Sequence, residues 1–536
     1  MKNSTISLLS AMFFLHFIAL SQTPVLVKNI NPTGGSDPTK MIDINGQLFF
    51  SANDEVHGQE LWASDGTSIG TNIVLDINPS GSSDAKNLIN NNGIVFFSAN
   101  DGINGEELWK SNGLGTETML VKDINIGGSS VPAFLTLLNG LVFFQANNGS
   151  NGIELWKSDG TESGTQMVVD IFAAGSSEPK YLVNYNGILY FSAESVLYGR
   201  ELWKSDGTSA GTVMIADINP AGSSDPSYLT VSNGILYFQA KDANGTELWK
   251  SDGTSVGTSM VKNINPSGNA DPIGLTNAND LLFFSASDGQ SGVELWKSDG
   301  TEIGTVLVKN INTNAGSNPT ILTNAYETSY FRATDGVTGQ ELWKSDGTVD
   351  GTILVKDINQ QGNSNSSPNY LTPYNNKIYF SATNSSNGYE LWVSDGTTAN
   401  TTMVMDINPG NGSSDPAFLA VSNNKLFFSA NNLTDGQELW MLDQTLDIIA
   451  FDSNNSIQIF PNPSSDFVKI QFAEIQQGSE SIVVEIIDLN GKKLLKKQIH
   501  AEMGNVELDV SMLACGVYLC RIIFDEKQTT KKLIIE

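Results

Sequence analysis

Nine glutamates recur within one short phrase of the chain, and two carboxylates at a suitable distance are sufficient for glycoside hydrolysis. A catalytic acid is a single exception within its fold and does not recur in every repeat. We therefore interpret these glutamates as hydrogen-bonding groups within or between sheets. The phrase reads ELWKSDGT at residues 154–161, 201–208, 247–254, 294–301 and 341–348, with looser copies at 60–67, 107–114, 390–397 and 438–445. The glutamates are Glu60, Glu107, Glu154, Glu201, Glu247, Glu294, Glu341, Glu390 and Glu438.

Histidine is too scarce to build a catalytic or metal site. The chain has three histidines, His16, His57 and His500, and only His57 lies within the repeats. One histidine supplies neither a metal-binding cluster nor a Ser-His-Asp arrangement. The sequence also lacks a phosphate-binding P-loop and a glycine-rich dinucleotide motif.

Arginine is equally scarce, so a carboxylate-binding arginine triad is not expected. The repeat is broken at one residue, Val131, and over two stretches, ESVLYGRE (194–201) and NAYETSYFRA (324–333). These positions converge on no recognisable site. We therefore predict no catalytic residues, no bound cofactor and no enzyme activity. The arginines are Arg200, Arg332 and Arg521.

Two recurring loops are rich in oxygen ligands and could hold Ca²⁺, which prefers several carboxylates and carbonyls. The alternative is turn chemistry, because Asp before Gly or Pro initiates turns without an ion. Replacement of the acid by Val131, Asn318 and Ser367 favours the turn, and we predict no metal site, with Ca²⁺ left as the open alternative. The acids of the loop between units are Asp37, Asp84, Glu178, Asp225, Asp271 and Asp415, and those of the second loop are Asp54, Asp101, Asp242, Asp288 and Asp335.

Short antiparallel strands must position all of these residues. All nine tryptophans belong to the phrase, 46 to 49 residues apart, and such a period indicates a propeller or a solenoid. Residues 181–218 contain four strand-like segments, with Asn186-Gly187 as a hairpin signal and ILYFSA as a strand that is apolar on both faces. Four strands per unit favour a propeller blade.

The third strand of each unit places its Leu and its Trp on opposite faces of the sheet. Both faces of a blade need apolar cover, so we expect Trp203 and Leu202 to pack between neighbouring blades. Asp206-Gly207 and Gly211 are predicted to supply the positive φ values of the next turn. The Lys after the Trp is expected to lay its stem along the sheet and keep its ammonium in water.

The ends of the repeat predict a ring. A lone fourth strand, VLVKNI at 25–30, precedes the first unit, and the ninth unit stops after its third strand. Pairing these two ends would close the ring and remove its exposed sheet edges. We predict an all-β fold with a single propeller of nine four-stranded blades over residues 22–443, closed by the N-terminal strand. Eight blades with an irregular unit, or two rings, remain alternatives.

The repeat resembles the bacterial ELWxxDGT repeat family, through GxELWxSDGTxxGT and the intervening LVxDINPxGSSDP. The resemblance covers about residues 24–443. It implies a secreted propeller, of the kind found in marine and gut Bacteroidetes-type bacteria, without an established chemistry.

The N-terminus has the features of a secretory signal peptide over residues 1–21. Lys2 precedes an apolar run from about Leu8 to Leu20, and Ala19 and Ser21 stand at the positions that signal peptidase prefers. No later stretch is apolar for long enough to span a bilayer as a helix. The two cysteines, Cys515 and Cys520, would lie about 16 Å apart on one strand, so we expect two small core residues and no disulfide.

The last eighty residues follow a different pattern. A linker at 444–456 precedes alternating apolar segments that predict a small β-sandwich over 457–536. This segment resembles the type A C-terminal sorting domain of the type IX secretion system, through Pro461-Asn462-Pro463, DLNGK, LACGVYL and the closing KKLIIE. The resemblance implies that the type IX machinery is a partner, followed by removal of the domain and release or attachment at the cell surface.

The net charge of the chain argues against some classes of ligand. The net charge is −29 and the pI near 4.3, so the chain repels nucleic acid and anionic membranes. We expect a monomeric protein, exported through the periplasm, that binds a glycan or another protein through its loop-bearing rim. An extracellular polysaccharide-degrading enzyme with a site at the channel, and a structural surface-layer or matrix component, remain alternatives.

Overall fold

A computed structural model describes residues 23–173, 175–443, 457–472, 482–488, 492–499, 505–524 and 527–535. The predicted signal peptide (1–21) and linker (444–456) lie outside these residues. The described chain is nearly all β, with one short 3₁₀ helix, η1 (Gly115–Glu117). It divides into two compact units, Met1–Asp443 and Gln444–Glu536. Within the described residues no helix is long and apolar enough to cross a membrane.

The first unit is built from nine four-stranded antiparallel sheets among its described residues. Strands one and two of each sheet form a hairpin at the start of each repeat. Strands one are β2 (Thr39–Ile44), β6 (Lys86–Asn91), β10 (Ala133–Leu138), β14 (Lys180–Tyr185), β18 (Ser227–Ser232), β22 (Ile273–Ala278), β26 (Thr320–Ala325), β30 (Asn369–Tyr374) and β34 (Ala417–Ser422). Strands two are β3 (Gln47–Asn53), β7 (Ile94–Asn100), β11 (Leu141–Asn147), β15 (Ile188–Ser195), β19 (Ile235–Asp242), β23 (Leu281–Ser287), β27 (Thr328–Thr334), β31 (Lys377–Thr383) and β35 (Lys425–Asn431).

Strands three carry the ELW phrase, and strands four are the short outer strands that follow it. Strands three are β4 (Gln59–Ser64), β8 (Glu106–Ser111), β12 (Ile153–Ser158), β16 (Gly199–Ser205), β20 (Gly245–Ser251), β24 (Val293–Ser298), β28 (Gln340–Ser345), β32 (Tyr389–Ser394) and β36 (Gln437–Asp443). Strands four are β5 (Asn72–Leu75), β9 (Met119–Lys122), β13 (Gln166–Val169), β17 (Val213–Ala216), β21 (Ser259–Lys262), β25 (Val306–Lys309), β29 (Ile353–Lys356), β33 (Thr402–Met405) and, for the last sheet, β1 (Val25–Lys28).

The hairpin turns form where the sequence predicts them. β14 and β15 pair with Tyr185 opposite Ile188, so Asn186-Gly187 forms a two-residue turn. Asn186 has φ 52° and Gly187 φ 74°, which is the backbone twist that a tight hairpin requires. Both faces of β15 are buried, as expected for the segment ILYFSA.

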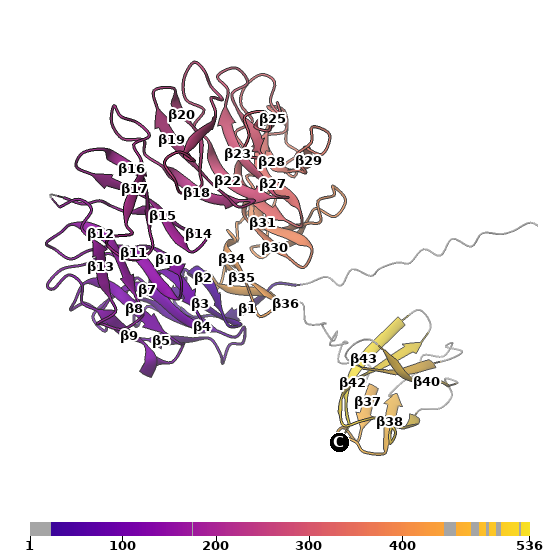
Figure 1. Cartoon of the computed structure of the whole chain (residues 1–536). Helices are drawn as coiled ribbons and strands as arrows, with labels where there is room; N and C mark the ends of the chain where they lie inside the picture. Colours follow the sequence, from indigo (N-terminus) through magenta and orange to yellow (C-terminus); the bar gives the residue numbers. More distant parts are fainter. Residues whose placement is uncertain are drawn as a thin grey trace, which may run out of the picture. The chain divides into compact units, whose positions relative to one another are not determined.

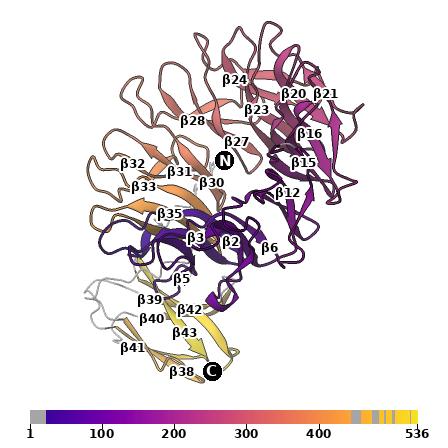
Figure 2. The same cartoon turned by 90° about the vertical axis from the view of Figure 1, so that its left-hand side faces the viewer.

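Contacts between the sheets give a propeller-like arrangement. Each strand one contacts strand one of the next sheet, and β34 of the last sheet contacts β2 of the first. β1 pairs antiparallel with β36, so the N-terminal strand completes the sheet of β34 to β36. Figures 1 and 2 show the sheets placed around a common centre with their first strands on the inside.

The tryptophans pack between neighbouring sheets, as predicted. Trp109 lies in one apolar cluster with Phe97 of its own sheet and with Phe49 and Leu61 of the preceding sheet. The cluster between the last sheet and the first has the same composition, with Leu439 against Trp62. The indoles are 5–8% exposed in eight of the nine repeats, and Trp203 is half-buried. The Leu-Trp pair is therefore a joint between sheets.

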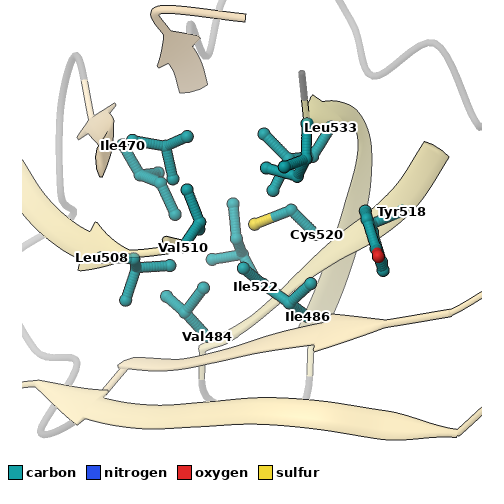
Figure 3. Close-up of a cluster of buried hydrophobic side chains, with 11 residues drawn as sticks. Ile470, Val484, Ile486, Leu508, Val510, Tyr518, Cys520, Ile522 and Leu533 are labelled. Carbon is teal, nitrogen blue, oxygen red and sulfur yellow. The ribbon is translucent and has the colours of Figure 1, made fainter. Parts of the chain in front are cut away.

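The second unit contains two sheets, as expected of a small β-sandwich. Its strands are β37 (Ile457–Phe460), β38 (Phe467–Phe472), β39 (Ile482–Ile487), β40 (Lys493–Ile499), β41 (Asn505–Asp509), β42 (Gly516–Phe524) and β43 (Lys527–Ile535), in the orders β37-β38-β41 and β40-β39-β42-β43. The apolar cluster between the sheets includes Ile470, Leu508, Ile486 and Cys520 (Figure 3).

One of the two cysteine predictions is wrong. Both thiols are free; Cys520 is buried, and its burial raises the thiol pKa to about 12. Cys515 is exposed, because β42 begins only at Gly516 and the residue before it belongs to a turn. The strand pattern therefore holds for Cys520 and ends one residue short of Cys515.

Candidate functional site

The recurring glutamates, here called the clamp glutamates, are buried and fully engaged in hydrogen bonds. Glu154 on β12 accepts bonds from the backbone N–H of Ile171 (2.9 Å) and of Ser177 (2.9 Å) and from the Ser177 hydroxyl (2.6 Å). Ile171 follows strand four, and Ser177 lies in the loop that leads to the next sheet. Each clamp glutamate therefore fixes the connection between sheets, and all nine side chains are shielded from solvent.

The last clamp glutamate acts over the longest sequence separation. Glu438 accepts bonds from Ile30 N (3.0 Å), Asn31 N (3.0 Å) and the Ser36 hydroxyl (2.6 Å). These donors follow the N-terminal strand β1. The clamp that joins consecutive repeats elsewhere thus joins the two ends of the repeat region here.

Burial raises the pKa of the clamp glutamates, and the hydrogen bonds that they accept offset only part of this effect. For Glu201, Glu247 and Glu341 the pKa rises to about 7. Glu247 has no serine hydroxyl, because Ala270 occupies that position, and it relies on backbone donors alone. A raised pKa at every repeat is a consequence of the fold and does not single out a catalytic acid.

The SDGT part of the phrase forms a closed set of hydrogen bonds. Asp206 accepts bonds from the N–H (2.8 Å) and the hydroxyl (2.7 Å) of Thr208, and Ser205 bonds the Thr212 hydroxyl (2.7 Å). Gly207 has φ 89° as predicted. The expectation for Gly211 is wrong: its φ is not positive, and a Cβ there would lie 2.1 Å from the Asp206 carboxylate. At the equivalent position of repeat eight, the Asn400 amide donates to Asp395 (2.6 Å).

The lysine after the Trp also differs from expectation. Lys204 Nζ donates to the carbonyl of Gly253 (2.8 Å), which lies in the SDGT turn of the next repeat. Lys157, Lys250 and Lys297 make the equivalent bond. The ammonium therefore joins neighbouring repeats and is not simply solvated.

The loop between strands two and three is capped by its first residue. The Asp101 carboxylate accepts bonds from Ile103 N (2.9 Å) and Asn104 N (2.7 Å), and Asn148 makes the same two bonds through its amide oxygen. Burial would raise the pKa of Asp101, but these bonds lower it overall. Because Asn substitutes for Asp without loss of the bonds, this acid serves turn formation.

The acid of the loop between sheets sits at a backbone position in the left-handed region. Asp84 has φ 51° and Asn318 φ 49°, and Val131 occupies the same position with φ 52°. Val131 N donates to the carbonyl of Glu106 (3.1 Å), as Asp84 N does to Gln59. The position is therefore defined by its backbone. Among the described residues, no three His, Cys, Asp or Glu side chains are grouped to hold a metal ion.

His57 and the arginines occupy separate places in the fold. His57 forms an ion pair with Asp54 (2.8 Å) in the loop between β3 and β4, and this bond raises the pKa of the imidazole. Arg200 contacts Glu178 (3.3 Å) in the stretch 194–201, and Arg332 donates to the Thr320 hydroxyl (3.1 Å). The arginines of the two irregular stretches thus contact polar residues of neighbouring segments.

Sequence reasoning missed one position, the second residue of each strand one, here called the inner position. These residues have positive φ or are glycine, and their identities vary. A signal was present, because in eight repeats the inner position follows the proline of the preceding loop by two residues. The inner residues are Lys40, Asn87, Phe134, Tyr181, Tyr228, Gly274, Ile321, Tyr370 and Phe418.

In the second unit the sequence motifs serve to hold the last strand. The Asn462 amide donates to Lys532 O (2.8 Å) and accepts from Ile534 N (2.8 Å), so the PNP motif is pinned to β43. Tyr518 of LACGVYL donates to Ala514 O (2.7 Å). On β39, Glu485 lies beside Lys493 (2.9 Å) and Arg521 (3.6 Å), and these cations lower its pKa.

Several solved structures resemble the chain at low identity. A puromycin hydrolase variant with bound PGG is 12% identical (TM-score 0.35; 66% of this chain, 60% of that one). A puromycin-hydrolysing peptidase of Mycobacterium tuberculosis is 10% identical (0.34; 68% and 61%), and an α-L-arabinofuranosidase of Clostridium thermocellum 16% (0.21; 42% and 94%). The chain thus spans about 60% of the puromycin hydrolase and of the puromycin-hydrolysing peptidase. With TM-scores below 0.5, no activity of these proteins is transferred to this chain.

No curated protein matches the chain. One family model does match, over residues 458–536: the secretion system C-terminal sorting domain. This match coincides with the second unit and with the motifs that hold β43. Residues 458–536 are therefore a C-terminal sorting domain, which engages the type IX secretion system and directs the protein to the cell surface or the extracellular space.

Proposed function

We propose that the protein is an exported binding protein whose first unit is a nine-bladed propeller, closed by β1, that contacts a glycan or protein ligand through its loop-bearing face. This face carries the loops between sheets and the loops between strands two and three. Equivalent loops around one face allow several weak contacts to act together. The protein binds its ligand without turnover, as a monomer.

The observation that supports this proposal is a rigid set of loops with variable tips. In seven repeats the first residue of the loop between strands two and three accepts capping bonds from the backbone, and the third residue of the loop is exposed and varies in type. Binding residues characteristically lie on loops held by a rigid scaffold. The tip residues are Val56, Ile103, Ser150, Gln290, Val337, Ser386 and Thr434.

Three of these tips are strongly apolar. The side chains of Ile103, Val56 and Val337 are 86%, 79% and 70% exposed, so they gain no packing energy in the isolated protein. In repeat four, Leu197 is 81% exposed in a differently shaped loop. Apolar side chains kept in solvent at equivalent places are suited to contact with a partner surface.

The proposal is tested with the purified full-length protein on immobilised polysaccharides and on cell-surface proteins. The expected result is saturable binding that weakens when Ile103→Ser and Val56→Ser are combined, with no product release. Reducing-end release from a polysaccharide would favour an extracellular degrading enzyme instead. Self-assembly without any ligand would favour a structural surface-layer or matrix role.

A further inference from the structure

Three aromatic side chains from consecutive sheets form a continuous exposed run at the inner position. Phe134, Tyr181 and Tyr228, here called the aromatic arc, are 40%, 38% and 41% exposed. The ring centroids of Phe134 and Tyr181 are 6.3 Å apart, and those of Tyr181 and Tyr228 are 5.8 Å apart. The planes are tilted by 47° and 42°, so the run follows the curve of the first strands. Three large rings kept in solvent need an explanation beyond packing.

A β-bulge turns these side chains away from the sheets. The pairing of strands one and two shifts register between Ala133 and Thr136, and the same shift recurs in the sheets of Tyr181 and Tyr228. At the bulge all three aromatic residues have φ 56°. The hydroxyl of Thr230 fixes the bulge by donating to Tyr228 O (2.9 Å). Bulges commonly re-aim a side chain next to a functional site.

The fold requires the bulge but not the aromatic rings. The same backbone conformation occurs at Lys40, Asn87 and Ile321, where the side chains are unrelated. A left-handed conformation is costly for any bulky residue, so three neighbouring aromatic residues occupy these positions despite a local penalty. In the described part of the chain no residue hydrogen-bonds the hydroxyl of Tyr181 or Tyr228. These rings and hydroxyls are available to a ligand.

We propose that the aromatic arc binds an oligosaccharide by stacking sugar rings on Phe134, Tyr181 and Tyr228, an inference that rests on the proposed binding function. One face of a pyranose presents apolar C–H groups that pack on an aromatic ring, and its hydroxyls point sideways to polar partners. The spacing of the rings is comparable with one hexose unit of an extended glycan. Nucleic-acid bases also stack on aromatic rings, but a net charge of −29 repels their phosphates.

Polar groups stand beside the arc to receive the sugar hydroxyls. Lys180 precedes Tyr181 and is neutralised by Glu178 (2.8 Å), so the pair offers a donor and an acceptor with little net charge. Further along the inner side, Lys40, Lys86 and Asn87 line a cavity of about 360 Å³ between β2 and β6. The Lys40 ammonium lies 6.0 Å from the centroid of the Phe418 ring. The first strands thus present hydrogen-bonding groups at Lys40 and Asn87 next to the stacking rings of the arc.

The test is titration calorimetry of the full-length protein with hexamers of β-1,4-glucan, β-1,4-xylan and polygalacturonate. For whichever hexamer binds, Tyr181→Ala is expected to weaken the affinity about tenfold, because the central stacking ring is lost. Tyr181→Phe keeps the ring and should retain affinity within about threefold. If polygalacturonate binds more tightly than the neutral hexamers and Lys40→Ala removes this difference, the site extends to uronic acids. If the neutral hexamers bind as tightly as polygalacturonate, the site is confined to the arc.

The matched control is Tyr326→Ala, which removes an exposed tyrosine (49%) from the hairpin turn between β26 and β27 and leaves both the arc and the loops between strands two and three intact. Unchanged melting temperatures establish that each variant is folded. If a hexamer binds and Tyr181→Ala binds it as tightly as the wild type, the arc proposal is overturned while the binding function stands. Failure of all three hexamers also overturns it, and binding of a proline-rich peptide that depends on Tyr181 would reassign the arc to a protein ligand.

Discussion

The clamp glutamates and the inner positions both occur nine times at equivalent places, and they differ in every other respect. The clamp position is always glutamate, fully buried, with its oxygens bonded to the chain that leads to the next sheet. The inner position holds a cation, an amide, aromatic rings, an aliphatic residue and a glycine, most of them in contact with solvent. In a repeat protein, a residue that is identical in every repeat indicates the contacts that hold neighbouring repeats together. A position whose residue type varies while its backbone conformation stays the same indicates a surface that contacts other molecules.

The clamp side of this contrast predicts the largest effect. Glu154→Ala leaves the N–H of Ile171, the N–H of Ser177 and the Ser177 hydroxyl without an acceptor in the interior. We expect the free energy of unfolding to fall by about 3 kcal/mol, measured by urea denaturation. Glu162→Ala, which removes an exposed glutamate from the turn between β12 and β13, should change it by less than about 0.5 kcal/mol.

A conservative variant sharpens this prediction. Glu154→Gln keeps one acceptor oxygen and the side-chain volume, so its loss should be smaller than that of Glu154→Ala. Equal stability of Glu154→Ala and the wild type would show that the clamp bonds do not hold the sheets together. Glycan binding per folded molecule should be unaffected by either change, because the clamp lies outside the aromatic arc.

Stability should also depend on pH through the clamp. Burial raises the pKa of Glu201, Glu247 and Glu341 from 4.5 to about 7, so the folded state retains protons that the unfolded chain releases. The stabilising contribution is complete below about pH 4.5 and is lost as pH rises to 7. We therefore expect a higher melting temperature at pH 5 than at pH 8, by scanning calorimetry.

The carboxyl groups of the SDGT turns should give the opposite pH dependence, with stability falling at acidic pH. The Thr161 hydroxyl and N–H bond Asp159 and lower its pKa, so that its contribution is lost below about pH 4. A variant with Glu201→Gln and Glu341→Gln should show a shallower loss of stability between pH 5 and pH 8. An identical slope in this variant would contradict the assignment of the titration to the clamp.

Much of the fold follows from the sequence because it depends on local patterns. The spacing of the tryptophans, the alternation of Leu202 and Trp203 and the Asn186-Gly187 turn predicted antiparallel four-stranded sheets with tryptophan between them, and the structure confirms these features. Pattern sufficed here because each feature depends on strand periodicity or on a two-residue turn.

Contacts between repeats could not be predicted in the same way. The partner of Lys204 is a carbonyl 49 residues away, and the partners of Glu438 lie more than 400 residues away. The direction of Tyr181 depends on a bulge that the period of two does not reveal. The sequence showed which residues recur in every repeat. The inner position does not recur in residue type, and its shared backbone conformation became visible only in the structure.

A smaller effect tests the rule that backbone and not charge defines the loop between sheets. Val131 is a β-branched residue with φ 52° and is half exposed, so it pays a conformational penalty without packing gain. Val131→Asn, the residue found at the equivalent Asn318, should raise the free energy of unfolding by about 1 kcal/mol. Val337→Asn, at an exposed position without positive φ, should give no gain in the same denaturation assay. A loss in Val131→Asn would contradict the rule.

The smallest expected effect tests the inner position by gain of function. Gly274 is the inner residue of the sheet next to that of Tyr228 and shares its backbone conformation, with φ 66°. A Cβ there would meet Leu322 at an ordinary 3.5 Å. Gly274→Tyr should extend the aromatic arc from three rings to four and strengthen binding of a hexamer about threefold, with a cost in stability of about 1 to 2 kcal/mol because a bulky residue is strained at positive φ. Gly274→Ser provides the control, since it adds a side chain without a stacking face and should leave affinity unchanged. If Gly274→Ser gains as much affinity for the hexamer as Gly274→Tyr, the gain comes from a stiffer backbone. The variable inner positions would then give no evidence of a binding surface.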